Sequence, residues 1–296
     1  MKDIYLFLKK DEVTKLCERI EMPVEATNTV CNLIDSFDFS VIAPYYHMLF
    51  SVKTGDEAVK EINAILENEE SKGFIWLTIY LAAVLDTKTT YDVLGIDEKI
   101  FYDTMAIFSR FVHEHKESFG VYGYDRQGWN YRQIACTLFR VDALEYEMCA
   151  FAGEDAIING ETVIATNENT ISIHIPSDAR LTAENNKTSL KNAVEFFDKH
   201  FHSFEYRMLY CHSWIISPNL KDVLDENSNI IKFLEMFEIY TANPEAENYK
   251  LWVFKNNSLT IDEFPQDTSL QRNIVKHLRQ GGKIGDAGGI IRKTSI

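Results

Sequence analysis

The sequence predicts an α+β protein in which a helical N-terminal domain is followed by a mixed β-sheet flanked by helices. Apolar residues recur at spacings of three and four as far as about residue 120, which is the period of an α-helix. After a cluster of glycines and aromatic residues at 120–128, short alternating and β-branched runs take over, and such runs are typical of strands. We therefore expect two domains, at residues 1–125 and 126–296.

Four segments carry the helical prediction for the first domain. One helix opens near Asp11, a second covers residues 58–66, and a third covers residues 74–85, which are apolar on nearly every side. A helix that is apolar all round belongs in the middle of a bundle. Asp97 is expected to cap the N-terminus of a fourth helix, because a side-chain oxygen at that position accepts a hydrogen bond from a free backbone amide.

The second domain is expected to follow the order βββ, α, β, α, β, α. Three antiparallel strands are predicted between residues 144 and 175, with a hairpin turn at Asn159-Gly160. A helix capped by Thr182, a strand over 207–216, a helix over 230–237 and a strand over 251–254 come next. The last helix begins at Thr268, and a Gly-rich basic tail follows it. Hairpins join antiparallel strands and helical crossovers join parallel ones, so the sheet should be mixed.

The charge of the chain is unevenly distributed. With 30 Lys and Arg against 45 Asp and Glu, the net charge is −15, which disfavours nucleic acid and anionic membranes as partners, because both are held by a basic field. Residues 272–296 alone carry a net charge of +5. The remainder is strongly acidic, so a small-molecule partner that is cationic or neutral is expected.

The cysteines and the apolar runs indicate a reduced, cytoplasmic protein. The five cysteines are scattered and never form a C-x-x-C pair, which argues against a disulfide framework and a zinc site. The first ten residues do not read as a signal peptide, and the longest apolar run has 12 residues, too few to span a bilayer. His113 and His115, two apart on a helix, point in different directions, so no metal is expected.

Several short phrases carry a resemblance to a known family. They are residues 101–105 (FYDTM), 138–140 (LFR), 144–147 (LEYE), 173–176 (IHIP), 211–214 (CHSW), 228–230 (SNI) and 268–272 (TSLQR). Together with the order of elements, they resemble a bacterial family of acyltransferases that joins a helical N-terminal domain to a GNAT-like C-terminal domain. The resemblance implies an acyl-CoA-dependent N-acyltransferase. Such an enzyme moves an acyl group from acetyl-CoA or another acyl-CoA directly to an amine or hydroxyl of a small-molecule acceptor.

Candidate catalytic residues lie on the predicted strands. Side chains alternate along a strand, so Glu145 and Glu147 share one face, and His174 could join them if the two strands are neighbours. His174 is our candidate general base, because a histidine can take the proton that an attacking amine must lose. A structural histidine and a solvated sheet face are the alternatives. Cys211 is a further candidate, as the nucleophile of a hydrolase, although a cysteine is more often buried in a core.

The candidate CoA-binding residues come in two groups. The resemblance implies a phosphate-binding loop at residues 176–182, where Ser177 and Arg180 could contact the pyrophosphate. This loop has no glycine, whereas family members usually have a Gly-rich loop here. A second group, Gly281, Gly282, Lys283 and Gly285, could substitute for it, because glycines let backbone amides approach an anion closely. A loose or partner-docked tail is the alternative for that segment.

The missing glycine also leaves a different function open. A catalytically degenerate GNAT-like module that senses or binds a small molecule would need no ordinary phosphate loop. For an active enzyme, the resemblance implies a tyrosine that protonates the departing CoA thiolate, and Tyr240 and Tyr249 lie in the corresponding part of the chain.

Overall fold

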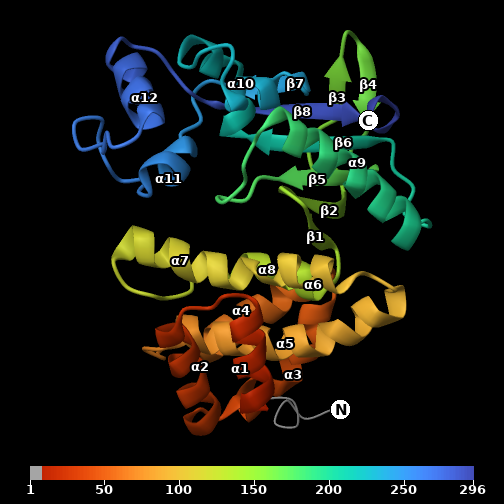
Figure 1. Ribbon diagram of the computed structural model, residues 1–296, viewed down its shortest axis with the longest axis vertical. Helices are drawn as coiled ribbons and strands as arrows, with labels where there is room; N and C mark the ends of the chain where they lie inside the picture. The colour runs from red at the N-terminus through yellow and green to blue at the C-terminus, as the bar shows by residue number, and fades with distance from the viewer. Residues whose placement is uncertain (1–8) are drawn as a thin grey trace. The chain divides into compact units, whose positions relative to one another are not determined.

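The computed structural model describes residues 9–296, and Figure 1 traces its elements along the chain. The chain divides into two compact units, one ending at Arg140 and the other running from Val141 to Ile296. The domain boundary expected after residue 125 stays a prediction. The prediction that there is no signal peptide concerns residues 1–10, and the first eight of these lie outside the described residues. Within residues 9–296, no helix has both the length and the apolar character that crossing a membrane requires.

The first unit is built from helices. They are α1 (Lys10–Arg19), α2 (Val24–Ser36), α3 (Ala43–Tyr46), α4 (Gly55–Ile65), α5 (Lys72–Leu94), α6 (Glu98–Met105), α7 (Ile107–Phe119) and α8 (Gln127–Ile134), with short 3₁₀ turns η2 (Phe39–Ile42) and η3 (His47–Phe50). The predicted cap is confirmed, because the Asp97 side chain accepts a hydrogen bond from the Lys99 amide at 2.7 Å.

Helix α5 forms the centre of this unit, as its apolar sequence predicts. Every residue from Ile75 to Val84 is buried, so the helix is covered on all sides by its neighbours. Trp76 and Tyr80 stack with ring centroids 5.4 Å apart, and the Trp76 indole donates to Asn63 of α4 at 3.0 Å. The helix ends where Gly95 adopts a left-handed φ of 65°, a conformation that costs glycine little.

The second unit contains a mixed sheet flanked by helices, which confirms the predicted fold class. The sheet has the order β1-β2-β5-β6-β8-β7, and β3 and β4 form a separate hairpin. The elements are β1 (Leu138–Val141), β2 (Leu144–Ala150), β3 (Ala156–Ile158), β4 (Glu161–Ile164), β5 (Asn169–His174), α9 (Ala183–His200), β6 (Met208–Ser213), α10 (Asn229–Leu234), β7 (Glu238–Asn243), α11 (Tyr249–Phe254), α12 (Ser269–Arg279) and β8 (Asp286–Arg292), with 3₁₀ turns η4 (Trp214–Ile216), η5 (Pro218–Asp222) and η6 (Lys293–Ser295).

Local sequence signals for turns and caps are confirmed in this unit. Asn159 and Gly160 both have positive φ, 52° and 83°, as a two-residue hairpin turn requires. Thr182 caps α9 by accepting from the Asn185 amide, and Thr268 forms a capping box with Gln271 at the start of α12. These signals are read correctly because they depend on neighbouring residues only.

The prediction of a strand at residues 251–254 was wrong, because these residues lie in helix α11. The predicted Gly-rich tail contains a strand that was not predicted, β8, which is buried and pairs with β6 on one side and β7 on the other. Figure 1 shows β8 between these neighbours. Gly288 and Gly289 fit there because neighbouring side chains occupy the space of a Cβ: one at Gly288 would lie 2.5 Å from the Tyr240 ring, and one at Gly289 would lie 2.8 Å from Phe237 Cβ.

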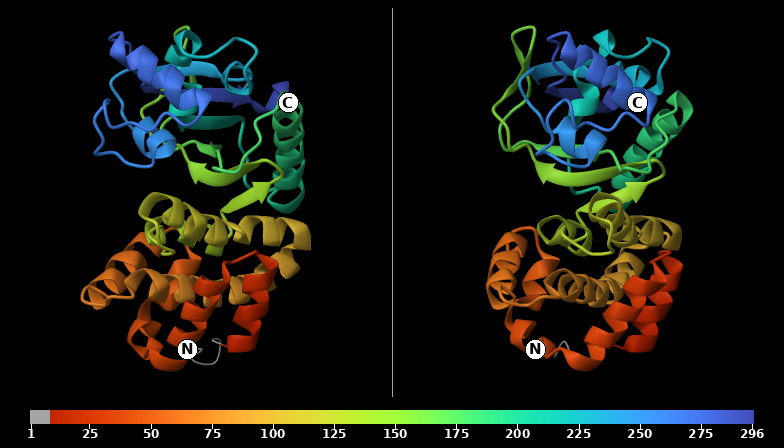
Figure 2. Two further views of the ribbon diagram at one scale, coloured as in Figure 1. Left: turned by 60° about the vertical axis from the view of Figure 1, so that its left-hand side comes forward. Right: turned by 90° about the vertical axis from the view of Figure 1, so that its left-hand side faces the viewer.

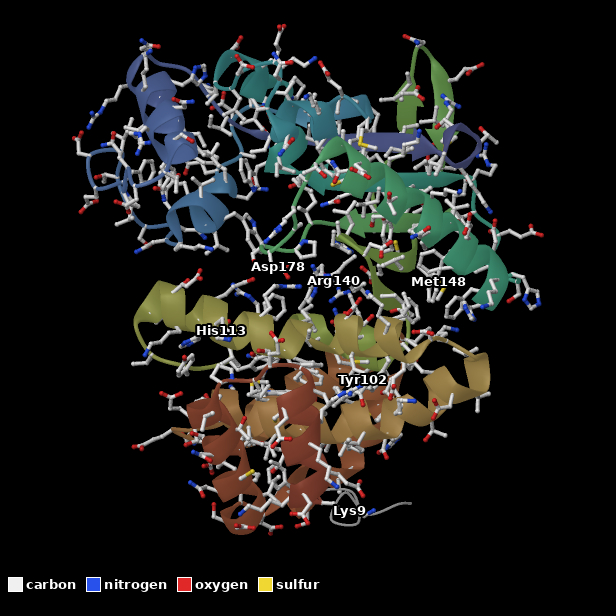
Figure 3. The ribbon with its side chains drawn as sticks, in the orientation of Figure 1. Lys9, Tyr102, His113, Arg140, Met148 and Asp178 are labelled. Carbon is white, nitrogen blue, oxygen red and sulfur yellow. The ribbon has the colours of Figure 1, made fainter. Side chains whose placement is uncertain are left out.

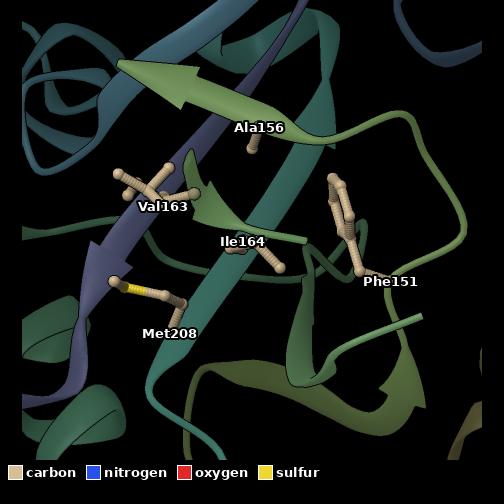
Figure 4. Packing of buried hydrophobic residues seen from close by; sticks show 6 residues of the cluster. Phe151, Ala156, Val163, Ile164 and Met208 are labelled. Carbon is tan, nitrogen blue, oxygen red and sulfur yellow. The ribbon is translucent and has the colours of Figure 1, made fainter. Parts of the chain in front are cut away.

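The two faces of the sheet are covered differently. On one face, α9 packs against the sheet (Figure 2), and its Ser189 hydroxyl lies 2.9 Å from the Tyr146 hydroxyl of β2. On the other face, the β3–β4 hairpin closes one end over a small apolar cluster (Figure 4). Its residues are Phe151, Ala156, Val163, Ile164, Met208 and Ile290. The rest of that second face is polar, and it carries the candidate site.

Candidate active site

The pairing of β2 with β5 brings the predicted glutamates to His174. The two strands are antiparallel, with Glu145 opposite His174 and Glu147 opposite Ser172. His174 Nε2 lies 2.9 Å from Glu147 Oε2, and the exposed fractions of the two side chains are 23% and 13%. Glu145 is buried, at 3% exposure. All four side chains point to the polar face, because residues directly opposite in a sheet share a face.

The hydrogen bond to Glu147 determines which nitrogen of His174 can act as a base. An ionised carboxylate can only accept a hydrogen bond, so the proton of a neutral His174 lies on Nε2. The lone pair is then on Nδ1, since the partner of one ring nitrogen fixes the state of the other. A carboxylate that holds an imidazole in one tautomer is the arrangement that a general base needs.

Strands β5 and β6 are parallel, but they pair over a short length. Within the described residues, their ladder consists of Ile171 with Leu209 and Ser172 with Tyr210. Beyond this point β5 continues along β2 to His174, and β6 continues along β8 to Ser213. The two strands therefore separate towards their C-terminal ends by more than the roughly 4.8 Å between paired strands. Their facing backbone edges could hydrogen-bond an extended ligand.

Tyr210 lies at the point where this separation begins. Its ring packs edge-on against Phe151, with centroids 5.2 Å apart, and its hydroxyl lies 3.9 Å from Cys149 Sγ. Burial raises the pKa of Tyr210 above its usual value, and a hydrogen bond with Ser172 opposes that shift. The phenol is therefore a neutral hydrogen-bonding group between the two strands.

A second histidine, His212, lies on the same face as His174. Its Nε2 is 3.8 Å from Asp286 Oδ1, and the two side chains are 51% and 9% exposed. Asp286 Oδ2 accepts a hydrogen bond from Asn248 Nδ2 at 2.9 Å. Neighbouring residues alternate on the strand predicted over 207–216, so His212 was expected on the other face of the sheet from Cys211. Asp286 was missed, because its segment was predicted as a tail and not as a strand.

Cys211 points to the opposite face of the sheet from His174. It is 1% exposed, and burial raises the pKa of its thiol to about 12. A nucleophilic cysteine needs a thiolate, and a thiol with this pKa stays protonated near neutral pH. The catalytic role of Cys211 remains a prediction, and its placement argues against it.

The predicted phosphate loop connects β5 to α9. Ser177, Asp178 and Arg180 are exposed there, and Figure 3 labels Asp178 on this loop. Helix α9 has 18 residues, and the first amides of a helix of this length form a site for anions. The loop thus combines a helix N-terminus with one cation and one nearby carboxylate.

The glycines after α12 have packing reasons of their own. Gly281 ends the helix with a φ of 84°. A Cβ on Gly282 would lie 2.2 Å from the His277 ring, and one on Gly285 would lie 2.4 Å from the Asn243 carbonyl oxygen. Lys283 forms an ion pair with Glu245. The contact of these four residues with CoA stays a prediction that the structure does not require.

The positive charges of the C-terminal segment are also largely paired. Four cations are in ion pairs with acidic residues earlier in the chain, so the segment does not present its net charge of +5 to solvent. The pairs are Arg279–Asp262, Lys283–Glu245, Arg292–Glu238 and Lys293–Asp198.

Comparison with known families assigns both halves of the chain. Residues 11–136 match the model of an N-acyltransferase N-terminal domain, and residues 138–291 match the model of a GNAT-like C-terminal domain. The chain belongs to the GNAT-like acyltransferase family. The resemblance seen in the sequence is therefore confirmed, and this GNAT-like protein has the two-domain organisation of an acyltransferase.

Solved structures agree with the fold of this GNAT-like protein. A crystal structure of an acyltransferase in complex with decanoyl-CoA and teicoplanin is similar with a TM-score of 0.77 and 21% identity, over 95% of this chain and 88% of that one. A mutant acyltransferase in complex with octanoyl-CoA has a TM-score of 0.77 and 20% identity, over the same shares. No curated protein matches the chain in sequence.

Proposed function

We propose that this protein is an acyltransferase that moves an acyl group from acyl-CoA directly to an amine or hydroxyl of a small-molecule acceptor. Membership of the GNAT-like family supports the reaction class. The observation that carries the proposal for the site is the hydrogen bond between His174 and Glu147, beside two parallel strands that separate. A base is thus held where an extended thioester could lie.

In the proposed reaction, the acceptor attacks the thioester carbonyl within a ternary complex. His174 Nδ1 takes the proton from the attacking nitrogen or oxygen, the new bond to the acyl carbon forms, and the bond from that carbon to sulfur breaks. Glu147 stabilises the imidazolium that results. A positioned base of this kind accelerates a reaction by about 10²- to 10⁴-fold.

The CoA is expected to bind along the separated strands, with its phosphates near α9. An extended pantetheine arm carries amides, which suit the free backbone groups on the facing edges of β5 and β6. The N-terminus of α9 and the Arg180 guanidinium favour the pyrophosphate. Since packing already explains Gly282 and Gly285, we assign the first phosphate contacts to Ser177 and Arg180.

The acceptor is proposed to be a neutral or cationic small molecule. A net charge of −15 favours the encounter with cations over anions, although it says nothing of the bound geometry. Teicoplanin, the glycopeptide bound by one structural neighbour, belongs in the panel of acceptors to be tested, as do simple amines and alcohols.

Calorimetric titration and a transfer assay test this function. Acetyl-, octanoyl- and decanoyl-CoA would each be titrated, then incubated with spermidine, glucosamine, hexanol, glutamate and teicoplanin, and the products identified by mass spectrometry. We expect saturable heat with at least one acyl-CoA, and an acylated amine or alcohol other than glutamate. A ligand at 100 times its Kd would stabilise the protein by about 2.7 kcal/mol, which a thermal shift would register.

Two outcomes would contradict the proposal in different ways. No heat and no thermal shift at millimolar acyl-CoA would exclude a CoA-dependent reaction. Binding without turnover on any acceptor would favour the alternative of a degenerate sensor or binding module, to which the loop without glycine also points.

A further inference from the structure

Two histidine–carboxylate pairs lie at the same level on the two separating strands. Ser172 of β5 is paired with Tyr210 of β6, and His174 and His212 each follow two residues later. Residues two apart on a strand share a face, so both histidines project from the polar face on opposite sides of the opening. Glu147 partners the first and Asp286 the second.

The two pairs differ in a way that suits different tasks. His174 is largely covered and within hydrogen-bond distance of its carboxylate, whereas His212 is about half exposed and lies 3.8 Å from Asp286. Asp286 is itself only 9% exposed. One carboxylate oxygen of Asp286 accepts a hydrogen bond from Asn248 Nδ2 at 2.9 Å, and the other lies 3.8 Å from His212 Nε2, so the carboxylate is fixed beside His212. The half-exposed His212 ring can exchange a proton with solvent, as a proton donor must after each turnover.

From this arrangement, we infer that His212 is the general acid of the acyl transfer, and that Asp286 is its positioning residue. This inference rests on the proposed function. When the bond between the acyl carbon and sulfur breaks, the electron pair goes to sulfur, and the imidazolium of His212 gives its proton to the thiolate to form the CoA thiol. His174 holds the proton taken from the acceptor. Solvent returns both histidines to their starting states, so protons balance.

Glycine at position 288 contributes to this placement. Gly288 is the cross-strand partner of His212, and the Tyr240 ring occupies the space that a side chain on Gly288 would need. The imidazole therefore has no β8 side chain directly beside it on this face. Burial raises the pKa of Tyr240 above its usual value, so this phenol stays protonated and is the competing proton donor.

Titratable groups face His212 from each neighbouring strand. Tyr210 lies on its own strand, Asp286 on β8 and Tyr240 on β7. Across the opening lie His174 of β5 and Glu147 of β2. The effect of a His212 substitution must therefore be separated from the effects of these groups. A comparison of two leaving groups separates them, because only one of the two needs a proton.

The test compares two thioesters that differ in the need for a proton. CoA leaves decanoyl-CoA as an alkyl thiolate, whereas 4-nitrothiophenol leaves its decanoyl thioester as a stable aryl thiolate that requires no acid. With the best acceptor of the panel, we expect His212→Gln to lower kcat about 100-fold for decanoyl-CoA and less than about 3-fold for the aryl thioester. Asp286→Asn should also lower kcat more for decanoyl-CoA than for the aryl thioester, with a smaller loss than His212→Gln.

Three controls make the result decisive. His202→Gln removes an exposed histidine outside the site and should behave as the wild type. His174→Gln should lose activity with both thioesters, because a base is needed for either leaving group. Tyr240→Phe tests the competing proton donor. The inference would be overturned if Tyr240→Phe lost activity with decanoyl-CoA alone while His212→Gln kept wild-type activity.

The remaining outcomes are also distinguishable. Equal loss by His212→Gln on both thioesters would mean a structural role and would overturn the inference, as would wild-type activity of that variant. A wild-type protein that transfers nothing to any acceptor would instead refute the proposed function itself.

Discussion

The two faces of strand β6 have opposite characters, although they alternate residue by residue. Tyr210 and His212 point to the polar face, where carboxylates from β2 and β8 meet histidines. Cys211, between them, points to the apolar face and is 1% exposed. The difference shows that two residues adjacent in the sequence of a strand have side chains on opposite faces of the sheet. A cysteine next to a histidine is therefore no catalytic pair here.

Among the substitutions that test this difference between the two faces, His174→Gln should have the largest effect on activity. We expect His174→Gln to lower kcat by about 10²- to 10⁴-fold, since glutamine keeps much of the size but cannot take a proton. Steady-state assays with decanoyl-CoA would measure it, with calorimetry to show that CoA still binds. A variant within a factor of three of the wild type would remove His174 from the mechanism.

Glu147→Gln should have the next largest effect on activity. A glutamine amide can donate to Nε2 of His174, so the lone pair is no longer fixed on Nδ1. We expect a loss on the order of 10- to 100-fold in kcat, as for other residues that orient a histidine, with little change in KM. Rescue by Glu147→Asp would separate positioning from packing, and an equal loss in stability and activity would argue for packing alone.

The two central glycines of β8 provide a matched pair for stability. Gly289→Ala places a Cβ 2.8 Å from Phe237 Cβ on the apolar face, and Gly288→Ala places one 2.5 Å from the end of the Tyr240 side chain. Because the Tyr240 ring can rotate away and Phe237 Cβ cannot, Gly289→Ala should cost more, about 1–3 kcal/mol in unfolding free energy. Urea denaturation of both variants measures this, and the reverse order would contradict the assignment of faces.

Cys211→Ala should have the smallest effect on activity. We expect kcat and KM to stay at wild-type values while the unfolding free energy falls by roughly 1 kcal/mol, because a buried sulfur is removed. A pKa of about 12 leaves only about 10⁻⁴ of the thiol ionised at pH 8. Iodoacetamide should therefore modify native Cys211 very slowly. Rapid loss of activity on alkylation would restore the hydrolase hypothesis.

The sequence predicted the fold better than the site, and the reason is physical. Caps such as Asp97 and Thr268 and the turn at Asn159-Gly160 are determined by residues a few positions away, so they could be read directly. The alternation of Glu145 and Glu147 indicated their face, and the pairing of β2 with β5 then supplied the contact with His174.

What the sequence could not predict depends on contacts far apart in the chain. Residues 286–292 contain two glycines and few strand-forming residues at their start, so they read as a tail, yet the strand is buried between two others. Asp286 and its contact with His212 were missed for that reason. The helix of residues 249–254 was mistaken for a strand because a short apolar run suits either structure.

Direct transfer at the polar face is the central claim, and intact-protein mass spectrometry during a single turnover tests it most directly. Protein in excess would be mixed with decanoyl-CoA and the best acceptor, then quenched over a time course. The account predicts that the decanoyl group appears on the acceptor while the mass of the protein never changes. A decanoyl adduct that forms before the product, and that is absent from Cys211→Ala, would contradict it.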